Sequence, residues 1–296
     1  MAYSSITKPG DYFNTKLYTG TDAAQSLTGV GFQPDWTWIK CRSHGGTNFP
    51  HILSDAVRGV NKVLKSNTNE AEITDYSQGY VSAFDSDGFT VTGQDGVSGV
   101  GRTYAAWNWK ANGSGSANTD GTISSTVSAN TTAGFSVVTF TGNGTSGATV
   151  GHGLGAIPKM YIVKRRETTG RWQVYHVGTS NTTPQNQYLF LDGDEASASA
   201  TNRWNDTAPT SSVFSLGNST EVNASGGTYV AYVFASVKGF SQFGRYIGSG
   251  TTDGTFVYTG FKPALVIIKK HAAVNEWGIW DNKRDTFNVT NDIIYP

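Results

Sequence analysis

The segment Gly31-Phe32-Gln33-Pro34-Asp35-Trp36-Thr37-Trp38-Ile39-Lys40 decides the fold, because the chain repeats its pattern twice. The counterparts are Gly155-Ala156-Ile157-Pro158-Lys159-Met160-Tyr161-Ile162-Val163-Lys164 and Gly260-Phe261-Lys262-Pro263-Ala264-Leu265-Val266-Ile267-Ile268-Lys269. Each copy has a glycine three residues before the proline and a lysine six residues after it. Tandem copies of one unit indicate a protein that acts through its surface, its reach or the avidity of several copies rather than through one chemical site.

The repeating unit is about 105 residues long, which is the distance between Pro158 and Pro263. The interval from Pro34 to Pro158 is longer, at 124 residues. The excess falls within residues 110–134, a stretch rich in Asn, Gly, Ser and Thr that predicts a linker or surface insertion. A phenylalanine opens each copy, at Phe13, Phe135 and Phe240.

These boundaries predict five parts of the chain. They are an N-terminal arm (1–12), β module 1 (13–109), the linker or insertion (110–134), β module 2 (135–239) and the first half of β module 3 (240–296). Half a module would leave one side of a sheet uncovered. We therefore expect that the natural chain continues past residue 296, or that another subunit supplies the missing half.

Composition and local pattern predict an all-β protein. The chain has 36 glycines and 12% aromatic residues, and Asp-Gly and Asn-Gly turns separate short runs of β-branched and aromatic residues. The predicted strands are 37–41, 134–140, 160–164, 188–191, 229–234 and 264–269. Units of this length with many short strands predict tandem β-sandwiches of jelly-roll or lectin-like type, with an up-and-down barrel as the alternative.

Charge and cysteine content exclude several classes of protein. Lys plus Arg and Asp plus Glu each number 22, so the chain lacks the basic excess that is typical of nucleic-acid binders. The single cysteine, Cys41, excludes an intramolecular disulfide. Neither an apolar signal core nor an apolar run of 18 residues occurs, so we expect neither export by the usual route nor membrane insertion. A β-rich repeat protein of this kind is typical of virion components.

One glycine-rich segment imitates a cofactor motif. Residues 142–147 match G-x-G-x-x-G and follow a predicted strand. A dinucleotide site also needs a helix directly after the glycines to receive the pyrophosphate, and residues 148–153 do not have a helical pattern. We interpret the segment as a hairpin loop.

Acidic residues offer two weaker candidates. Glu70 and Glu72 could be the paired acids of a glycosidase, but they lack an aromatic-flanked strand context, and a solvated loop is favoured. Residues 192–195, Asp-Gly-Asp-Glu, could donate oxygens to calcium, but the twelve-residue loop with its terminal bidentate acid is missing. A polar turn is favoured there, with calcium as the alternative.

Histidines and the cysteine give no site. The histidines show no pairing suited to zinc and are expected at the surface or in turns; they are His44, His51, His152, His176 and His271. Cys41 is interpreted as a half-buried structural thiol. The sequence therefore predicts no catalytic, cofactor-binding or metal-binding residue, and no enzyme.

The recurrent aromatic residues are the remaining candidates for binding. Trp36 with Trp38, and Trp107 with Trp109, lie two residues apart on one strand face, and Trp172 and Trp277 each lie eight residues after a repeated lysine. Recurrence favours core packing over a sugar-stacking platform or a subunit contact. The repeated lysines, Lys40, Lys164 and Lys269, are expected to cap strand ends. Ligand-binding residues stay unknown.

Several longer motifs carry a family resemblance: Ser4 to Thr15, Gly31 to Trp36, Asp55 to Gly59, Ser86 to Val91 and Ala106 to Lys110. They resemble a family of uncharacterised tandem-repeat virion proteins of marine tailed bacteriophages, often described as tail-fibre-like, over residues 4–296. The resemblance implies a virion structural protein whose third module continues beyond the point where this chain stops. It implies no particular binding residues.

We therefore expect a non-enzymatic virion structural protein, a tail fibre or appendage component that adheres to the host surface by multivalent binding. A capsid decoration or head-fibre protein is the first alternative, and a glycan depolymerase is the second. The expected partners are other virion proteins, further copies in a homo-oligomer with a trimer favoured, and a host-surface glycan or protein receptor. Nucleic acid and membrane insertion are not expected. The expected location is the virion, assembled in the host cytoplasm.

Overall fold

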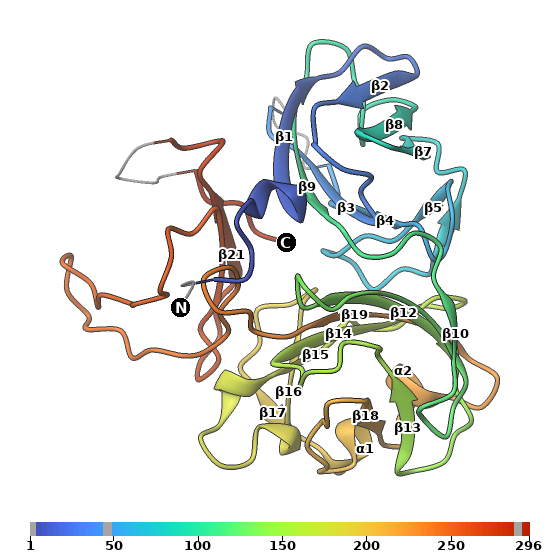
Figure 1. The fold of residues 1–296 in the computed structure, drawn as a ribbon, viewed down its shortest axis with the longest axis vertical. Coiled ribbons are helices and arrows are strands. Elements are labelled where there is room, and N and C mark those ends of the chain that lie inside the picture. Colours follow the sequence, from blue (N-terminus) through green and yellow to red (C-terminus); the bar gives the residue numbers. More distant parts are fainter. Residues whose placement is uncertain (1–3, 44–48, 287–291) are drawn as a thin grey trace.

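Antiparallel sheets dominate the computed structural model, which describes residues 4–43, 49–286 and 292–296 (Figure 1). Strands make up 38% of the residues and helices 6%, so the protein belongs to the all-β class, as predicted. Over the described residues no sheet closes into a barrel, which excludes the up-and-down barrel from this part of the chain.

Copy 1 of the repeat, residues 13–109, forms two sheets around one apolar cluster. The larger sheet has the order β1-β9-β3-β4, from Phe13–Thr19, Thr103–Trp109, Trp36–Cys41 and Ile52–Asp55. The smaller has the order β2-β8-β7, from Gln25–Thr28, Gly88–Thr92 and Tyr80–Asp85, beside a short pair of β5 (Lys62–Val63) and β6 (Ile73–Thr74). Leu27, Phe89 and Val91 of the smaller sheet pack with Ile39 and Tyr104 of the larger one.

Copy 2, residues 135–239, repeats this strand order. Its sheet contains β12-β19-β14-β15, from Phe135–Thr141, Thr228–Phe234, Met160–Arg165 and Gln173–His176. The pair β13 (Ala148–Gly151) and β18 (Val213–Leu216) corresponds to β2 and β8. The sheet continues beyond β15 through β16 (Gln187–Phe190) and β17 (Ala198–Ser199). Helices are short: η1 (Pro9–Asp11), η2 (Val177–Thr179), η3 (Pro184–Asn186), α1 (Thr201–Trp204) and α2 (Thr220–Asn223).

Residues 110–134, expected to be a linker or surface insertion, hold regular structure. They contain β10 (Ser116–Asn118) and β11 (Ser125–Asn130), and β11 pairs with β12 along its whole length. Ile123 and Val127 are buried against the core of copy 2. The inserted residues therefore extend the sheet of copy 2, because the outer edge of β12 is free to accept another strand.

Copy 3, residues 240–296, contributes one described hairpin. β20 (Leu265–Lys269) pairs with β21 (Trp277–Asp281), as β3 pairs with β4 and β14 with β15. Residues 240–248 align with β1 and β12 but form no strand. The reason is that β1 and β12 pair with the central strands β9 and β19, and copy 3 has no described strand of that kind.

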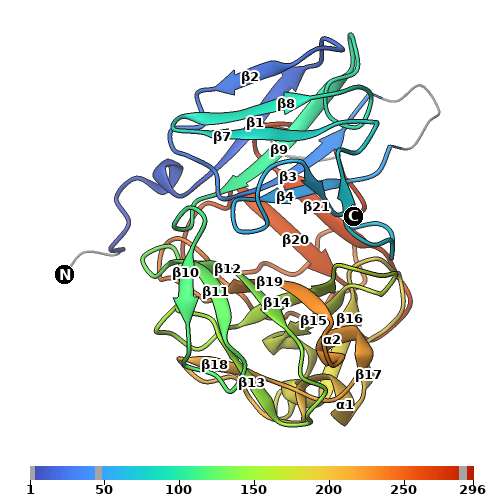
Figure 2. The same cartoon turned by 90° about the vertical axis from the view of Figure 1, so that its right-hand side faces the viewer.

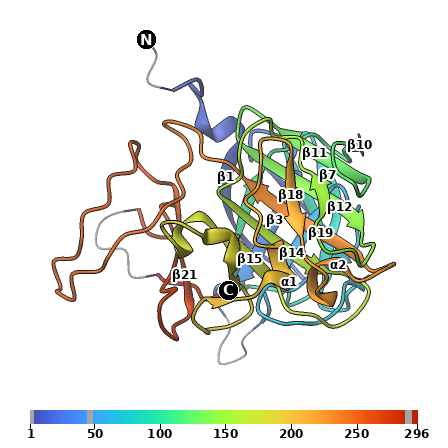
Figure 3. The same cartoon turned by 90° about the horizontal axis from the view of Figure 1, so that it is seen from below.

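The three copies share one central core. Figure 2 shows β20 and β21 between the large sheets of the other two copies, and Figure 3 shows β21 to one side of them. Trp36 and Trp107 of copy 1, Trp172 and Tyr232 of copy 2, and Trp277 of copy 3 belong to one buried cluster. The rings of Trp36 and Tyr232 stack with centroids 4.3 Å apart. The copies are therefore packed around a common centre instead of being strung in a row.

Candidate functional site

Three hydrogen bonds at equivalent positions close the copies into a ring. Residues 51 and 172 immediately precede β4 and β15, residue 277 is the first of β21, and each contacts a main-chain oxygen of another copy. Trp172 Nε1 donates to the oxygen of Lys65 at 2.8 Å, and Trp277 Nε1 donates to that of Phe190 at 2.7 Å. His51 Nε2 lies 2.9 Å from the oxygen of Tyr295. Copy 2 thus contacts copy 1, copy 3 contacts copy 2, and copy 1 contacts copy 3.

The His51 contact fits the same pattern as the two tryptophans. Burial, with Lys40 nearby, lowers the pKa of His51 well below its ordinary value, so the ring is neutral at pH 7. Trp38 Nε1 donates to His51 Nδ1 at 2.7 Å, which leaves the proton on Nε2. His51 therefore donates to Tyr295, as Trp172 and Trp277 donate to their acceptors.

Two of the three repeated lysines, Lys164 and Lys269, join neighbouring copies as well. Lys164 Nζ donates to the oxygen of Gly170 in its own copy at 2.8 Å and to that of Asn69 in copy 1 at 3.3 Å. Lys269 Nζ donates to Asn275 in its own copy and to Asp194 of copy 2 at 2.8 Å. The prediction that these lysines cap strand ends omitted the second contact, which crosses to the preceding copy.

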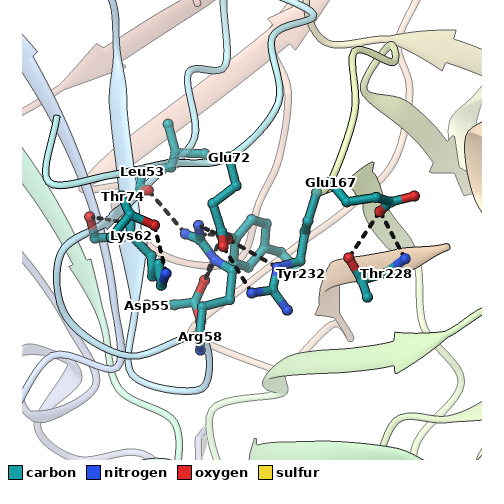
Figure 4. A network of polar contacts seen from close by, with 11 residues as sticks. Leu53, Asp55, Arg58, Lys62, Glu72, Thr74, Glu167, Thr228 and Tyr232 are labelled. Carbon is teal, nitrogen blue, oxygen red and sulfur yellow. Dashed lines mark hydrogen bonds and ion pairs between the residues drawn. The ribbon is translucent and has the colours of Figure 1, made fainter.

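A second set of junctions uses an Asp-x-x-Arg motif that begins at the last residue of β4 and of β21. In copy 1, Arg58 Nε lies 2.5 Å from Asp55 Oδ2 and Nη1 lies 3.0 Å from Glu72, with the side chains of Asp55 and Arg58 fully buried (Figure 4). The Tyr232 hydroxyl of copy 2 donates to Asp55 at 2.8 Å. Burial favours a lower pKa for Arg58, but Asp55, Tyr232 and Glu72 outweigh burial and raise it.

Copy 3 repeats this motif against copy 1. Arg284 Nε lies 2.5 Å from Asp281 Oδ2, and Trp107 Nε1 donates to the same oxygen at 2.9 Å. Trp107 is the fifth residue of β9, as Tyr232 is the fifth residue of β19. In copy 2, His176 stands at the place of Asp55, and burial, with His271 nearby, lowers its pKa to about 4. At the third junction, between copies 2 and 3, His176 is therefore neutral at pH 7.

Several polar residues contradict their predicted positions. Glu72, expected in a solvated loop, is largely buried between Arg58 and Arg166, whose Nη2 lies 2.9 Å from it. These two guanidinium groups lower the pKa of Glu72 against the opposing effect of burial. His51 and His152, expected at the surface or in turns, are buried. His176 is half-buried at the end of β15, His271 lies in a turn as expected, and His44 lies outside the described residues.

Other predictions are confirmed. Trp36, Trp38, Trp107, Trp172 and Trp277 all lie in the core. Cys41, expected to be half-buried, is fully buried instead, which raises the pKa of its thiol, and its Sγ lies 3.5 Å from the oxygen of Ser43.

The remaining polar candidates are occupied by contacts within the fold. Residues 142–147 form the loop between β12 and β13, where Asn223 accepts from the Asn143 amide at 2.9 Å. Glu70 is half exposed and pairs with Lys65 at 2.7 Å. In the segment 192–195, Asp192 and Glu195 both pair with Arg171. Over the described ranges, no group of three His, Cys, Asp or Glu residues could hold a metal ion.

The sequence did not single out Arg58, Glu72, Tyr232 and Arg284 as one set. The available signal was the Asp-x-x-Arg spacing at 55–58 and 281–284. In both copies it begins at the last residue of the second strand of an equivalent antiparallel pair. It was hidden because copy 2 has His176 and Thr179 at these places. The ring was hidden for the same reason, because His51 replaces tryptophan in copy 1.

The fold and its junctions define an all-β protein whose repeat copies are locked around one core. The chain belongs to the DUF7483 family, a domain family of unknown function whose model matches residues 8–296. Neither the curated proteins nor the solved structures give a significant match. Among the residues the structure describes, no helix is long and apolar enough to cross a membrane.

Replacing Trp172 with Phe should destabilise the fold, because it leaves the Lys65 oxygen without its donor. Trp36→Phe is the matched control, since the buried Trp36 indole N–H has no hydrogen-bond partner among the described residues. We expect Trp172→Phe to lower the free energy of unfolding by about 1–3 kcal/mol more than Trp36→Phe, measured by urea denaturation. Equal losses would contradict a role for the ring hydrogen bonds.

Asp55→Ala should leave Arg58 as a partly uncompensated buried charge. We expect a loss of about 3–5 kcal/mol in the free energy of unfolding. Asp253→Ala, at an exposed position, should change it by less than about 0.5 kcal/mol. The double variant Asp55→Leu/Arg58→Leu should lose less than Asp55→Ala. A double variant that is less stable than the single one would contradict this explanation.

Lys164 should make stability depend on pH in alkaline solution. Burial lowers its pKa to about 8, although Asp192 and Glu221 oppose this. Between pH 8 and about 10.5 the unfolded chain binds more protons at this residue than the folded one, so stability rises with pH. Relative to Lys164→Met, the wild-type protein should gain up to about 3 kcal/mol across this range in urea denaturation. Parallel pH profiles of the two proteins would refute the assignment.

Proposed function

We propose that the protein is a non-enzymatic structural protein of a bacteriophage virion, a tail fibre or appendage component that adheres to the host surface by multivalent binding. The observation that carries the proposal is the closed ring of copies around one core. In the ring, tryptophans and lysines at repeated positions hold the copies together, as the hydrogen bonds of Trp172, Trp277 and Lys164 illustrate. The outward-facing sheets and loops then remain to recognise the host surface.

The arrangement of the copies supports binding at several places. Figure 1 places β2, β8 and β7 of copy 1 at one end of the molecule and β13 and β18 of copy 2 at the other. Each of these outer sheets covers its own apolar cluster, so we propose that each copy is a β-sandwich of jelly-roll or lectin-like kind. Weak binding by two or more rigidly held surfaces raises the effective concentration at a host surface.

The resemblance of the motifs to repeat proteins of tailed bacteriophages supports a place in the virion. The proposed partners are other virion proteins and a host-surface glycan or protein receptor. A homotrimer of this chain stays a prediction. The proposed location is the virion, assembled in the host cytoplasm.

A capsid decoration protein is the second candidate, and the threefold repetition of the ring favours it. A chain with three similar faces around one centre can sit on a position of local threefold symmetry, as icosahedral shells provide. The two candidates differ in the part of the particle that carries the protein.

Immunogold labelling of intact particles with antibody to the purified protein should separate them. We expect gold at the tail or its appendages, together with binding of the labelled protein to host cells and none to cells stripped of surface glycan and protein. Gold confined to the head would refute the tail proposal in favour of capsid decoration. Release of reducing ends from host polysaccharide by the purified protein would refute the non-enzymatic proposal and favour a depolymerase.

A further inference from the structure

β20 has a strand neighbour on one edge only. β3 lies between β9 and β4, and β14 lies between β19 and β15, whereas β20 pairs with β21 alone among the described strands. The Asn282 amide donates to the oxygen of Ala264 at 3.0 Å, which sets the alternation of hydrogen bonds in this pair. The main-chain groups of Leu265, Ile267 and Lys269 therefore point to the open edge.

The side chains of β20 are correspondingly less covered than those of its counterparts. β3 is buried at every residue, and β14 is buried except at Arg165. Val266 is 36% exposed, whereas Tyr161 at the same place in β14 is fully buried. The segment that precedes β20 also exposes large apolar residues, with Ile247 at 85% and Phe256 at 86%. Exposed apolar residues gathered in one segment mark an interaction surface.

Among the described residues, the third junction lacks the aromatic hydrogen-bond donor from a central strand that the other two junctions share. Asp55 accepts a hydrogen bond from Tyr232 of β19, and Asp281 accepts one from Trp107 of β9. At the matching place in copy 2, the ring of His176 lies 6.3 Å from that of Phe243, which belongs to the segment without strand structure. The open edge and the third junction therefore lack the same element among the described residues, a central strand of copy 3.

We propose that the open edge of β20 binds one extended β-strand of the β9 and β19 type, supplied by a separate partner polypeptide. The strand runs antiparallel to β20, and the aromatic residue at its fifth position enters the central core beside His176. A second copy of residues 1–296 cannot supply it, because β9 and β19 each lie between two neighbours in their own sheets.

A synthetic peptide with the sequence of residues 226–236, carrying lysines at its ends for solubility, is the probe. The bond from the Arg166 amide to the Thr228 oxygen sets the pairing of β14 with β19. The amides of Val230 and Tyr232 therefore face β14, and that of Ala231 faces β12. A peptide N-methylated at the positions of Val230 and Tyr232 cannot donate these amides to β20. One N-methylated at Ala231 keeps both donors and is the matched control.

Hydrogen exchange of the wild-type protein, followed by NMR, reports the result. At saturating peptide we expect the Leu265 and Ile267 amides to exchange at least about tenfold more slowly, because hydrogen-bonded amides exchange only after opening. Val266 and Ile268, which face β21, should change little. The Ala231-methylated peptide should protect equally, and the doubly methylated peptide should not protect.

Three results would overturn the proposal. The first is unchanged exchange at Leu265 and Ile267 with any peptide. The second is equal protection by both methylated peptides, because strand pairing would then not be the mode of binding. The third is protection of these amides without peptide that grows with protein concentration alongside dimer formation in sedimentation, which would assign the edge to a second copy.

Discussion

The rest of the structure depends on the donors at the start of β4, β15 and β21. A sheet that is covered on one face by its own smaller sheet still needs cover on the other face, and each copy obtains it from its neighbours. The hydrogen bonds of His51, Trp172 and Trp277 fix how the neighbours are oriented, because each joins a ring N–H of one copy to a main-chain oxygen of another. The copies oriented in this way bring their aromatic rings together in the central cluster.

Charge plays a different part at each junction. Asp55 and Arg58 are fully buried, and their cost of desolvation is offset only because Tyr232, Glu72 and the Leu53 oxygen complete their hydrogen bonds. Asp281 and Arg284 reproduce this geometry with Trp107 in place of the tyrosine. Two unrelated side chains thus meet the same requirement, a donor on a flat ring at the fifth position of a central strand.

The sequence allowed the class of fold, the repeat and six of the 21 described strands to be predicted, because apolar β-branched runs and turn glycines act locally. The predicted strands 37–41 and 160–164 lie within β3 and β14. The burial of the tryptophans followed from their recurrence. The position of Glu72 and the role of His51 depend on which copy lies beside which, and that arrangement is decided by packing between residues far apart in the sequence. Residues 240–248 show the converse, since a strand pattern forms no strand without a partner to pair with.

The contact of His51 with Tyr295 spans 244 positions of the chain. Contacts between such distant residues form late, because the intervening chain must first be ordered. During synthesis, copy 1 therefore leaves the ribosome long before the last member of its own core exists. Copy 2 covers Trp36, but the face around Trp107 stays exposed until copy 3 arrives. Assembly order and speed of translation therefore bear on how much of the protein reaches the native state instead of aggregating.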